Sequence, residues 1–143
     1  MLSCDTSFLF SLYRKDAHTS TAMAFLARAA GPLILSSLNE YELGNALRFA
    51  EFRGLLPQGG AALRLEAFAE DRVAGRWHPS GITPEEILAE ANAISDRHTL
   101  KGGHRAFDIL HVAHAKLAGS KRFLSFDANQ IVLAKAVGLA VGP

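Results

Sequence analysis

The feature that most restricts how this chain can fold is the stretch 104–130, where an apolar helix is followed by a short apolar strand. Hydrophobic residues recur through 106–117 as in a buried helix, and a basic turn containing glycine ends it. Residues 123–126 favour a buried strand, with Asp127 at its carboxyl end. Asp108 lies one turn into the helix, where a buried carboxylate is unfavourable unless it is paired or bound to a cation. The two acids together predict a shared ligand.

The rest of the chain alternates short apolar segments with amphipathic ones. We expect strands at 2–6, 33–35, 123–126 and 138–142, with a loop or weak edge strand at 75–81. We expect helices at 8–13, 19–30, 38–52, 57–74, 84–97, 106–117 and 130–137, and a flexible basic loop at 98–104. This order favours a parallel sheet covered by helices on both faces. The predicted fold class is therefore α/β, a single three-layer α/β/α domain over 1–143 with a short, mainly parallel central sheet.

Composition excludes several classes of protein. A chain of 143 residues with 49% hydrophobic and 20% charged residues is long enough for one ordinary core, and it does not resemble a disordered chain. The single cysteine, Cys4, excludes an internal disulfide and is expected to be a buried structural thiol. Basic residues follow the first apolar run, whereas in a secretory signal they precede it, and no apolar run approaches the ~18 residues of a membrane span. We therefore expect a cytoplasmic protein without a membrane partner.

Further carboxylates follow the first two predicted strands. Asp5 lies at the carboxyl end of the first predicted strand, where it is either a helix cap or part of a site, because the carboxyl ends of parallel strands meet at one edge. Glu40 and Glu42 lie near the start of the helix at 38–52. The candidate site joins one of these glutamates to three aspartates, Asp5, Asp108 and Asp127. Clustered carboxylates repel one another and suit hard divalent cations, Mg²⁺ or Mn²⁺, which act on phosphate esters.

Only one of the two glutamates can face the site. At about 100° per residue, Glu40 and Glu42 point ~200° apart on a helix. Asn45, one turn beyond Glu42, would place a second polar group on the same side as Glu42. Helical periodicity by itself does not decide between them.

Histidines in the stretch 104–130 allow a second kind of site. His104, Asp108 and His111 are spaced i, i+4 and i+7, which would suit a transition metal held by two histidines. The alternative is that His104 is a loop residue and His111 is packed and hydrogen bonded. His114 is expected to lie at the surface.

Four segments together resemble the PIN-domain family and, within it, the VapC-type toxins of bacterial toxin–antitoxin pairs. They are Asp5-Thr6-Ser7, Glu42-Leu43-Gly44-Asn45-Ala46-Leu47-Arg48, Arg105-Ala106-Phe107-Asp108-Ile109-Leu110-His111-Val112-Ala113 and Phe123-Leu124-Ser125-Phe126-Asp127. The resemblance covers nearly the whole chain, and the last two segments at their mutual spacing are the most specific. Ser125 stands where the family usually has threonine, so the hydroxyl group is kept.

The resemblance implies a PIN-like nuclease domain and the chemistry of its site. It implies that four acids are catalytic and bind Mg²⁺ or Mn²⁺, namely Asp5, Glu42, Asp108 and Asp127. The family glutamate precedes the residue that matches Leu43, which selects Glu42 over Glu40. The implied reaction is hydrolysis of RNA phosphodiester bonds, leaving a 5′-phosphate and a 3′-hydroxyl.

The resemblance also implies partners for the chain. These are an RNA substrate, a cognate VapB-type antitoxin and a second copy of the chain in a homodimer. Residues 101–143 carry six basic against two acidic residues, which suggests that RNA phosphates lie near this segment. The candidate substrate-binding residues are Ser7, Lys101, Arg105 and Arg122. Ser7 or Thr6 either orients a phosphate or a water molecule, or caps the helix that follows.

Other functions share parts of this pattern. An aspartyl phosphatase of the haloacid dehalogenase type also places an aspartate after its first strand, but it uses a second one where this chain has Ser7. A receiver-like signalling module would need paired acids near its start and a lysine at a late strand end, and neither is found. A PIN-fold protein that processes RNA, or one that only binds a partner, is the remaining alternative.

Overall fold

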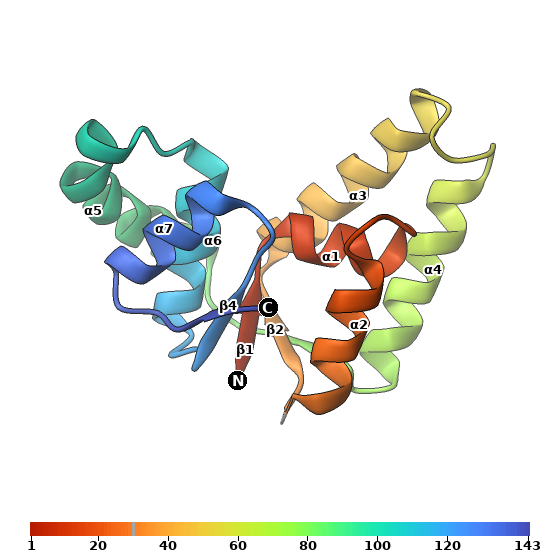
Figure 1. Ribbon diagram of the computed structural model, residues 1–143, viewed down its shortest axis with the longest axis horizontal. Helices are drawn as coiled ribbons and strands as arrows, with labels where there is room; N and C mark the ends of the chain where they lie inside the picture. Colours follow the sequence, from red (N-terminus) through yellow and green to blue (C-terminus); the bar gives the residue numbers. More distant parts are fainter. Residues whose placement is uncertain (30) are drawn as a thin grey trace.

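The computed structural model describes residues 1–29 and 31–143, which form five strands and seven helices (Figure 1). The strands are β1 Leu2–Cys4, β2 Leu33–Leu35, β3 Trp77–Pro79, β4 Arg122–Leu124 and β5 Val141–Gly142. The helices are α1 Thr6–Tyr13, α2 Thr19–Arg28, α3 Ser37–Phe52, α4 Gly60–Val73, α5 Pro84–Gly102, α6 Ala106–Leu117 and α7 Ala128–Ala136.

The five strands form one sheet in the order β3-β2-β1-β4-β5, and every neighbouring pair is parallel. The prediction of a parallel sheet is confirmed. From the central strand β1 the chain builds outward through β2 and β3, then returns to the other side of β1 with β4 and β5. This reversal creates a switch point between β1 and β4, and in open α/β sheets ligands bind beyond the carboxyl ends of the strands at such a point.

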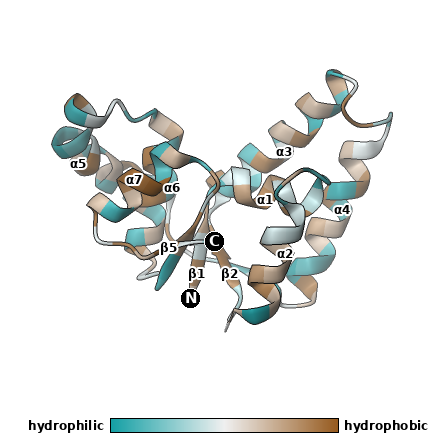
Figure 2. Cartoon of the chain, viewed as in Figure 1, coloured by the Kyte–Doolittle hydropathy of each residue, from teal (hydrophilic) through white to brown (hydrophobic). Residues whose placement is uncertain are grey.

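Helices cover both faces of the sheet. One hydrophobic cluster joins β1 and β2 to α1, α2, α3 and α4, while a second joins β4 to α5, α6 and α7. Figure 1 shows these groups of helices on opposite sides of the strands, and Figure 2 shows hydrophobic residues concentrated around α6 and α7 and the strands beside them. The predicted α/β/α architecture is confirmed. No helix among residues 1–29 and 31–143 is long and apolar enough to cross a membrane.

Two predicted boundaries are wrong for identifiable reasons. The expected loop at 98–104 is mostly helix, because α5 has no stop signal before Gly103, which ends it in the left-handed conformation with φ of 64°. Pro57 does not begin α4. Gly59 is the N-cap residue instead, with φ of 79°. Its backbone N–H donates a hydrogen bond to the Glu51 carboxylate. The predicted end of the helix at 19–30 lies outside the described residues.

His114 is buried, so the expectation that it lies at the surface is wrong. It lies on α6, whose side chains from Asp108 to Ala115 are all buried. Within the described chain neither ring nitrogen has a hydrogen-bond partner. Burial, with a smaller contribution from neighbouring His111, lowers the pKa of His114 to about 4.

We predict that His114 makes the fold sensitive to acid. Unfolded histidine has a pKa near 6.5, so between about pH 6.5 and pH 4 the unfolded state binds the proton that the folded state rejects. As the pH is lowered from about 6.5 to about 4, the free energy of unfolding should therefore fall by roughly 3 kcal/mol in total. Urea unfolding of His114→Leu at several pH values should lack this component, while the exposed control His78→Leu should keep it. Identical pH dependence in both variants would contradict the assignment.

Candidate active site

Asp5 connects the carboxyl ends of β1 and β4 through hydrogen bonds. Its Oδ1 accepts from the backbone N–H of Phe8 at 2.9 Å, which makes it the N-cap of α1. Its Oδ2 accepts from Ser125 Oγ at 2.6 Å and from Gln130 Nε2 at 2.9 Å, and Ser7 Oγ lies 2.8 Å from both oxygens. The cap interpretation of Asp5 is confirmed. The same carboxylate also ties α1 to the segment that begins α7.

Burial raises the pKa of Asp5, although hydrogen bonds from Ser125, Phe8 and Ser7 act against this rise. The side chain is fully buried. An ionised carboxylate at this depth is tolerated because several donors surround it, and a nearby cation would stabilise the ionised form further.

Asp108 and Asp127 share one guanidinium group. Arg105, the residue before α6, donates from Nε to Asp108 Oδ2 at 2.9 Å and from Nη2 to Asp127 Oδ2 at 3.3 Å. Asp127 also caps α7, since its Oδ1 accepts from the backbone N–H groups of Asn129 and Gln130. These contacts bring together two acids from different elements, one in the first turn of α6 and one at the start of α7. The pKa of Arg105 is raised by its hydrogen bond with Asp108 and by the charges of both aspartates.

Glu42 approaches the same place from α3. Its Oε2 accepts from the Thr6 hydroxyl and lies 2.5 Å from His111 Nε2. Burial acts to raise the pKa of Glu42, but hydrogen bonds from His111 and Thr6, with the positive charge of Arg105, lower it below its ordinary value. Glu42 is therefore held as a carboxylate at neutral pH.

Asn39 determines how His111 contacts Glu42. Asn39 Oδ1 accepts from the backbone N–H and hydroxyl of Ser36, so its amide nitrogen faces the Cys4 carbonyl at 3.0 Å and His111 Nδ1 at 3.2 Å. Because that amide can only donate, His111 Nδ1 accepts and Nε2 carries the hydrogen. His111 thus donates to Glu42. This confirms that His111 is a packed, hydrogen-bonded histidine.

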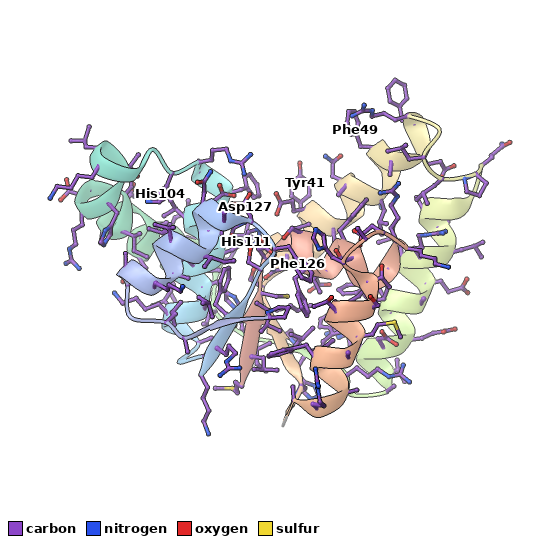
Figure 3. All side chains as sticks on the ribbon, in the orientation of Figure 1. Tyr41, Phe49, His104, His111, Phe126 and Asp127 are labelled. Carbon is purple, nitrogen blue, oxygen red and sulfur yellow. The ribbon has the colours of Figure 1, made fainter. Side chains whose placement is uncertain are left out.

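A cavity of about 390 Å³ opens where these side chains meet. Three of the four predicted acids line it, namely Glu42, Asp108 and Asp127, and Asp5 does not. Ser7 lines it and donates to Asp5 beneath. Figure 3 shows His111 and Asp127 converging between the two groups of helices, whereas His104 lies away from them.

The structure separates the predicted substrate-binding residues into two groups. Ser7 and Arg105 line the cavity. Lys101, on the last turn of α5, is exposed and does not line it. Arg122 begins β4, at the opposite end of the strand from Asp127, and lies over the ring of Phe25 in another hollow. Arg122 therefore does not line this cavity, and a contact between Arg122 and RNA stays a prediction.

The donor set suits a hard divalent cation. Carboxylates and hydroxyl groups are the ligands that Mg²⁺ and Mn²⁺ prefer, and the guanidinium shared by Asp108 and Asp127 shows that the site already attracts a cation. The carboxylates point to Arg105, His111 and hydroxyl groups, however. Across residues 1–29 and 31–143, no three His, Cys, Asp or Glu side chains are grouped closely enough to hold an ion as they stand. The donors fit the ion in chemistry, and the Arg105 contacts would give way on binding.

Two residues of the site were not identified from the sequence. They are Asn39 and Gln130, which contact His111 and Asp5 respectively. Gln130 is the one with a sequence signal, since it follows the strand-end aspartate by three residues, the spacing of a capping box. Asn39 contacts residues of other elements, and no local pattern marks it.

A parallel α/β domain with carboxylates at its switch point defines a protein that binds its ligand beyond the carboxyl ends of its strands. The family model of the PIN domain matches residues 3–136. The chain belongs to the PIN-domain family. No curated protein matches the sequence.

Solved structures share this fold along nearly the whole chain. VapC20 of Mycobacterium tuberculosis, described as a toxin that cleaves the sarcin–ricin loop, is 20% identical with a TM-score of 0.71, covering 98% of this chain and 97% of its own. FitAcB of Neisseria gonorrhoeae is 20% identical with a TM-score of 0.65, and the match covers 100% of this chain and 97% of FitAcB. A chain of FitAB bound to the IR36 DNA fragment is 20% identical with a TM-score of 0.70, and the match covers 99% of this chain and 94% of that one. At this identity the likeness is one of fold.

Proposed function

We propose that this chain is a metal-dependent endoribonuclease, a single PIN-like domain over 1–143 that hydrolyses RNA phosphodiester bonds. The observation that carries the proposal is the convergence of Glu42, Asp108 and Asp127 on one cavity at the switch point of the sheet. With Asp5 they are the catalytic and metal-binding residues. When bound, Mg²⁺ or Mn²⁺ would lower the pKa of a water molecule and neutralise charge that develops on the phosphate.

The chain's own residues prepare the site for a phosphate. His111, held by Asn39, keeps Glu42 pointing into the cavity. Asp5 fixes the ends of β1 and β4 relative to each other through Ser125 and Gln130. Arg105 lines the cavity, and its side chain is 71% exposed although it pairs with both aspartates. It can leave the acids and bind a substrate phosphate.

The same proposal includes the partners of a toxin. VapC20, which shares the fold, is described as a toxin that cleaves the sarcin–ricin loop, and this supports the role of a toxin. The proposal therefore includes a cognate VapB-type antitoxin and a homodimer. Such a protein would act on RNA in the cytoplasm. The antitoxin would block the cavity, because free activity would harm the host.

Two other functions fit the structure less well. An aspartyl phosphatase needs an exposed nucleophile after β1, but Asp5 is fully buried and surrounded by donors. A non-catalytic binding protein would not need three carboxylates on one cavity wall, where their mutual repulsion is a cost. A PIN-fold protein that processes RNA would share the chemistry and differ only in its substrate.

We predict that the purified chain cleaves single-stranded RNA in Mg²⁺ or Mn²⁺ and that EDTA abolishes cleavage. The products should carry 5′-phosphate ends, so that a 5′-phosphate-dependent exonuclease degrades them. Asp108→Asn prepared in parallel controls for contaminating nuclease. Cleavage that survives EDTA, or that the variant retains, would reject the proposal, and RNA binding without cleavage would favour the non-catalytic alternative.

A further inference from the structure

The cavity continues well beyond the acids. Helices α1 and α3 both begin at the carboxyl edge of the sheet, and the cavity follows them outward. On α3 its wall is formed by Glu42, Ala46, Phe49, Ala50 and Arg53, which are spaced i, i+4, i+7, i+8 and i+11 and so share one helix face. Phe49 is seven residues from Glu42, roughly 10 Å along the helix. Figure 3 shows Phe49 farther out on α3 than Tyr41, away from Asp127.

Two arginine–aromatic pairs form the outer part of the cavity. The guanidinium of Arg53 lies 5.8 Å from the ring centre of Phe49, and that of Arg14 lies 5.5 Å from the ring centre of Phe10. In the part of the chain that the structure describes, neither guanidinium pairs with a carboxylate. Between them the wall is lined by the small side chains of Ala46 and Ala50, which leave room for a flat group.

The outer cavity therefore has the opposite charge to the inner cavity. All three acids that line the cavity belong to the catalytic group, whereas the outer lining carries two unpaired cations beside aromatic rings. Aromatic faces that stack bases, next to arginines that contact phosphates, are the means by which proteins bind single-stranded nucleic acid. A mainly acidic or apolar peptide would leave one of these two features unused.

We propose that Phe10, Arg14, Phe49 and Arg53 form a nucleotide subsite for single-stranded RNA, adjacent to the position of the cleaved bond. The base of a flanking nucleotide stacks on Phe49, and its phosphate lies between Arg14 and Arg53. The inference rests on the proposed ribonuclease function and adds the location and contacts of the substrate strand.

The test compares matched variants on α3. Phe49 and the C-cap residue Arg53 line the cavity. Tyr41 and Arg48 are exposed on α3 and do not line it, whereas Phe52 is unsuitable as a control because its ring stacks on Phe49. Binding of fluorescein-labelled single-stranded RNA is measured by anisotropy in EDTA, and KM and kcat are measured during cleavage in Mn²⁺. Phe49→Ala should raise Kd and KM between about 5-fold and about 150-fold with little change in kcat, which is the range for loss of one stacked base. Arg53→Ala should reduce the slope of log K against log salt by about 0.7.

Tyr41→Ala and Arg48→Ala should behave as the unsubstituted protein does, and thermal unfolding of all four variants checks that they fold. Phe49→Ala and Arg53→Ala that match their controls in Kd, KM and salt slope, in a protein that cleaves RNA, would overturn the subsite and leave the ribonuclease intact. If Phe49→Ala and Arg53→Ala lost binding to a partner protein but kept their RNA affinity, that result would also overturn the subsite, in favour of a protein-docking surface. An unsubstituted protein that neither binds nor cleaves RNA would instead reject the proposed function, and the subsite with it.

Discussion

We expect Glu42→Gln to lower the rate of RNA cleavage at least roughly 100-fold, because loss of a carboxylate that we propose binds the metal should exceed the 10–100-fold cost of losing an outer partner. Glutamine keeps the size of the side chain and can still accept from Thr6 and His111, so the contacts that hold α3 remain possible. The change therefore removes the charge with little effect on packing. The measurement is the initial rate of cleavage in Mn²⁺ together with a thermal unfolding curve.

Glu40→Gln is the matched control. Glu40 lies two residues earlier on α3, outside the cavity lining, and is placed in the first turn of the helix where an acid favours the helix dipole. It should retain most of the activity. If Glu40→Gln abolished cleavage while Glu42→Gln retained it, the acidic wall of the cavity would not be the catalytic one.

The sequence predicts the part of the site that is local to each element. Asp127 follows an apolar strand, and Asp108 interrupts an apolar helix whose observed bounds, Ala106–Leu117, are those expected. Both acids stand out in the sequence because an ionised side chain is unfavourable among buried apolar residues unless it has a partner. The choice of Glu42 over Glu40 came from the family resemblance, and of these two glutamates only Glu42 lines the cavity.

Other contacts depend on how elements pack and have no local signal. Asn39 reaches the Cys4 carbonyl and His111 because β2 lies beside β1 and α6 packs against both α3 and β1. His114 was misjudged for a related reason. A helix covered on all sides shows no polar face, so a single histidine within it is as deeply buried as its neighbours.

The basic carboxyl-terminal segment is a similar case. Its charge excess suggested contact with RNA, yet of Lys101, Arg105 and Arg122 only Arg105 lines the cavity, and Arg122 lines another hollow. Charge counted along the chain does not report which end of a strand a residue occupies. Arg122 stands at the amino end of β4, and only its carboxyl end reaches the site.

We expect Mn²⁺ to stabilise the fold, and we expect Asp108 and Asp127 to account for most of that effect. An ion that binds only the folded state adds about 2.7 kcal/mol to the free energy of unfolding at one hundred times its Kd. For a chain of this length that corresponds to a rise in Tm on the order of 8 °C. This measurement does not depend on any activity of the protein.

Asparagine is the informative substitution at both positions. Asp108→Asn and Asp127→Asn remove a charge from the wall of the cavity, and asparagine at 127 can still cap α7 because it is as good an N-cap as aspartate. Each variant should therefore fold and lose most of the Mn²⁺-induced rise in Tm. Asp96→Asn, exposed on α5, should keep the full rise.

Arg105→Ala gives the opposite test of the same site. The guanidinium occupies the space between Asp108 and Asp127, so it competes with the ion for both carboxylates. Its removal should increase the stabilisation at a given Mn²⁺ concentration, while RNA binding weakens because a phosphate contact is lost. A shift in Tm that is the same in the unsubstituted protein, Asp108→Asn, Asp127→Asn and Arg105→Ala would place the Mn²⁺ site elsewhere on the molecule.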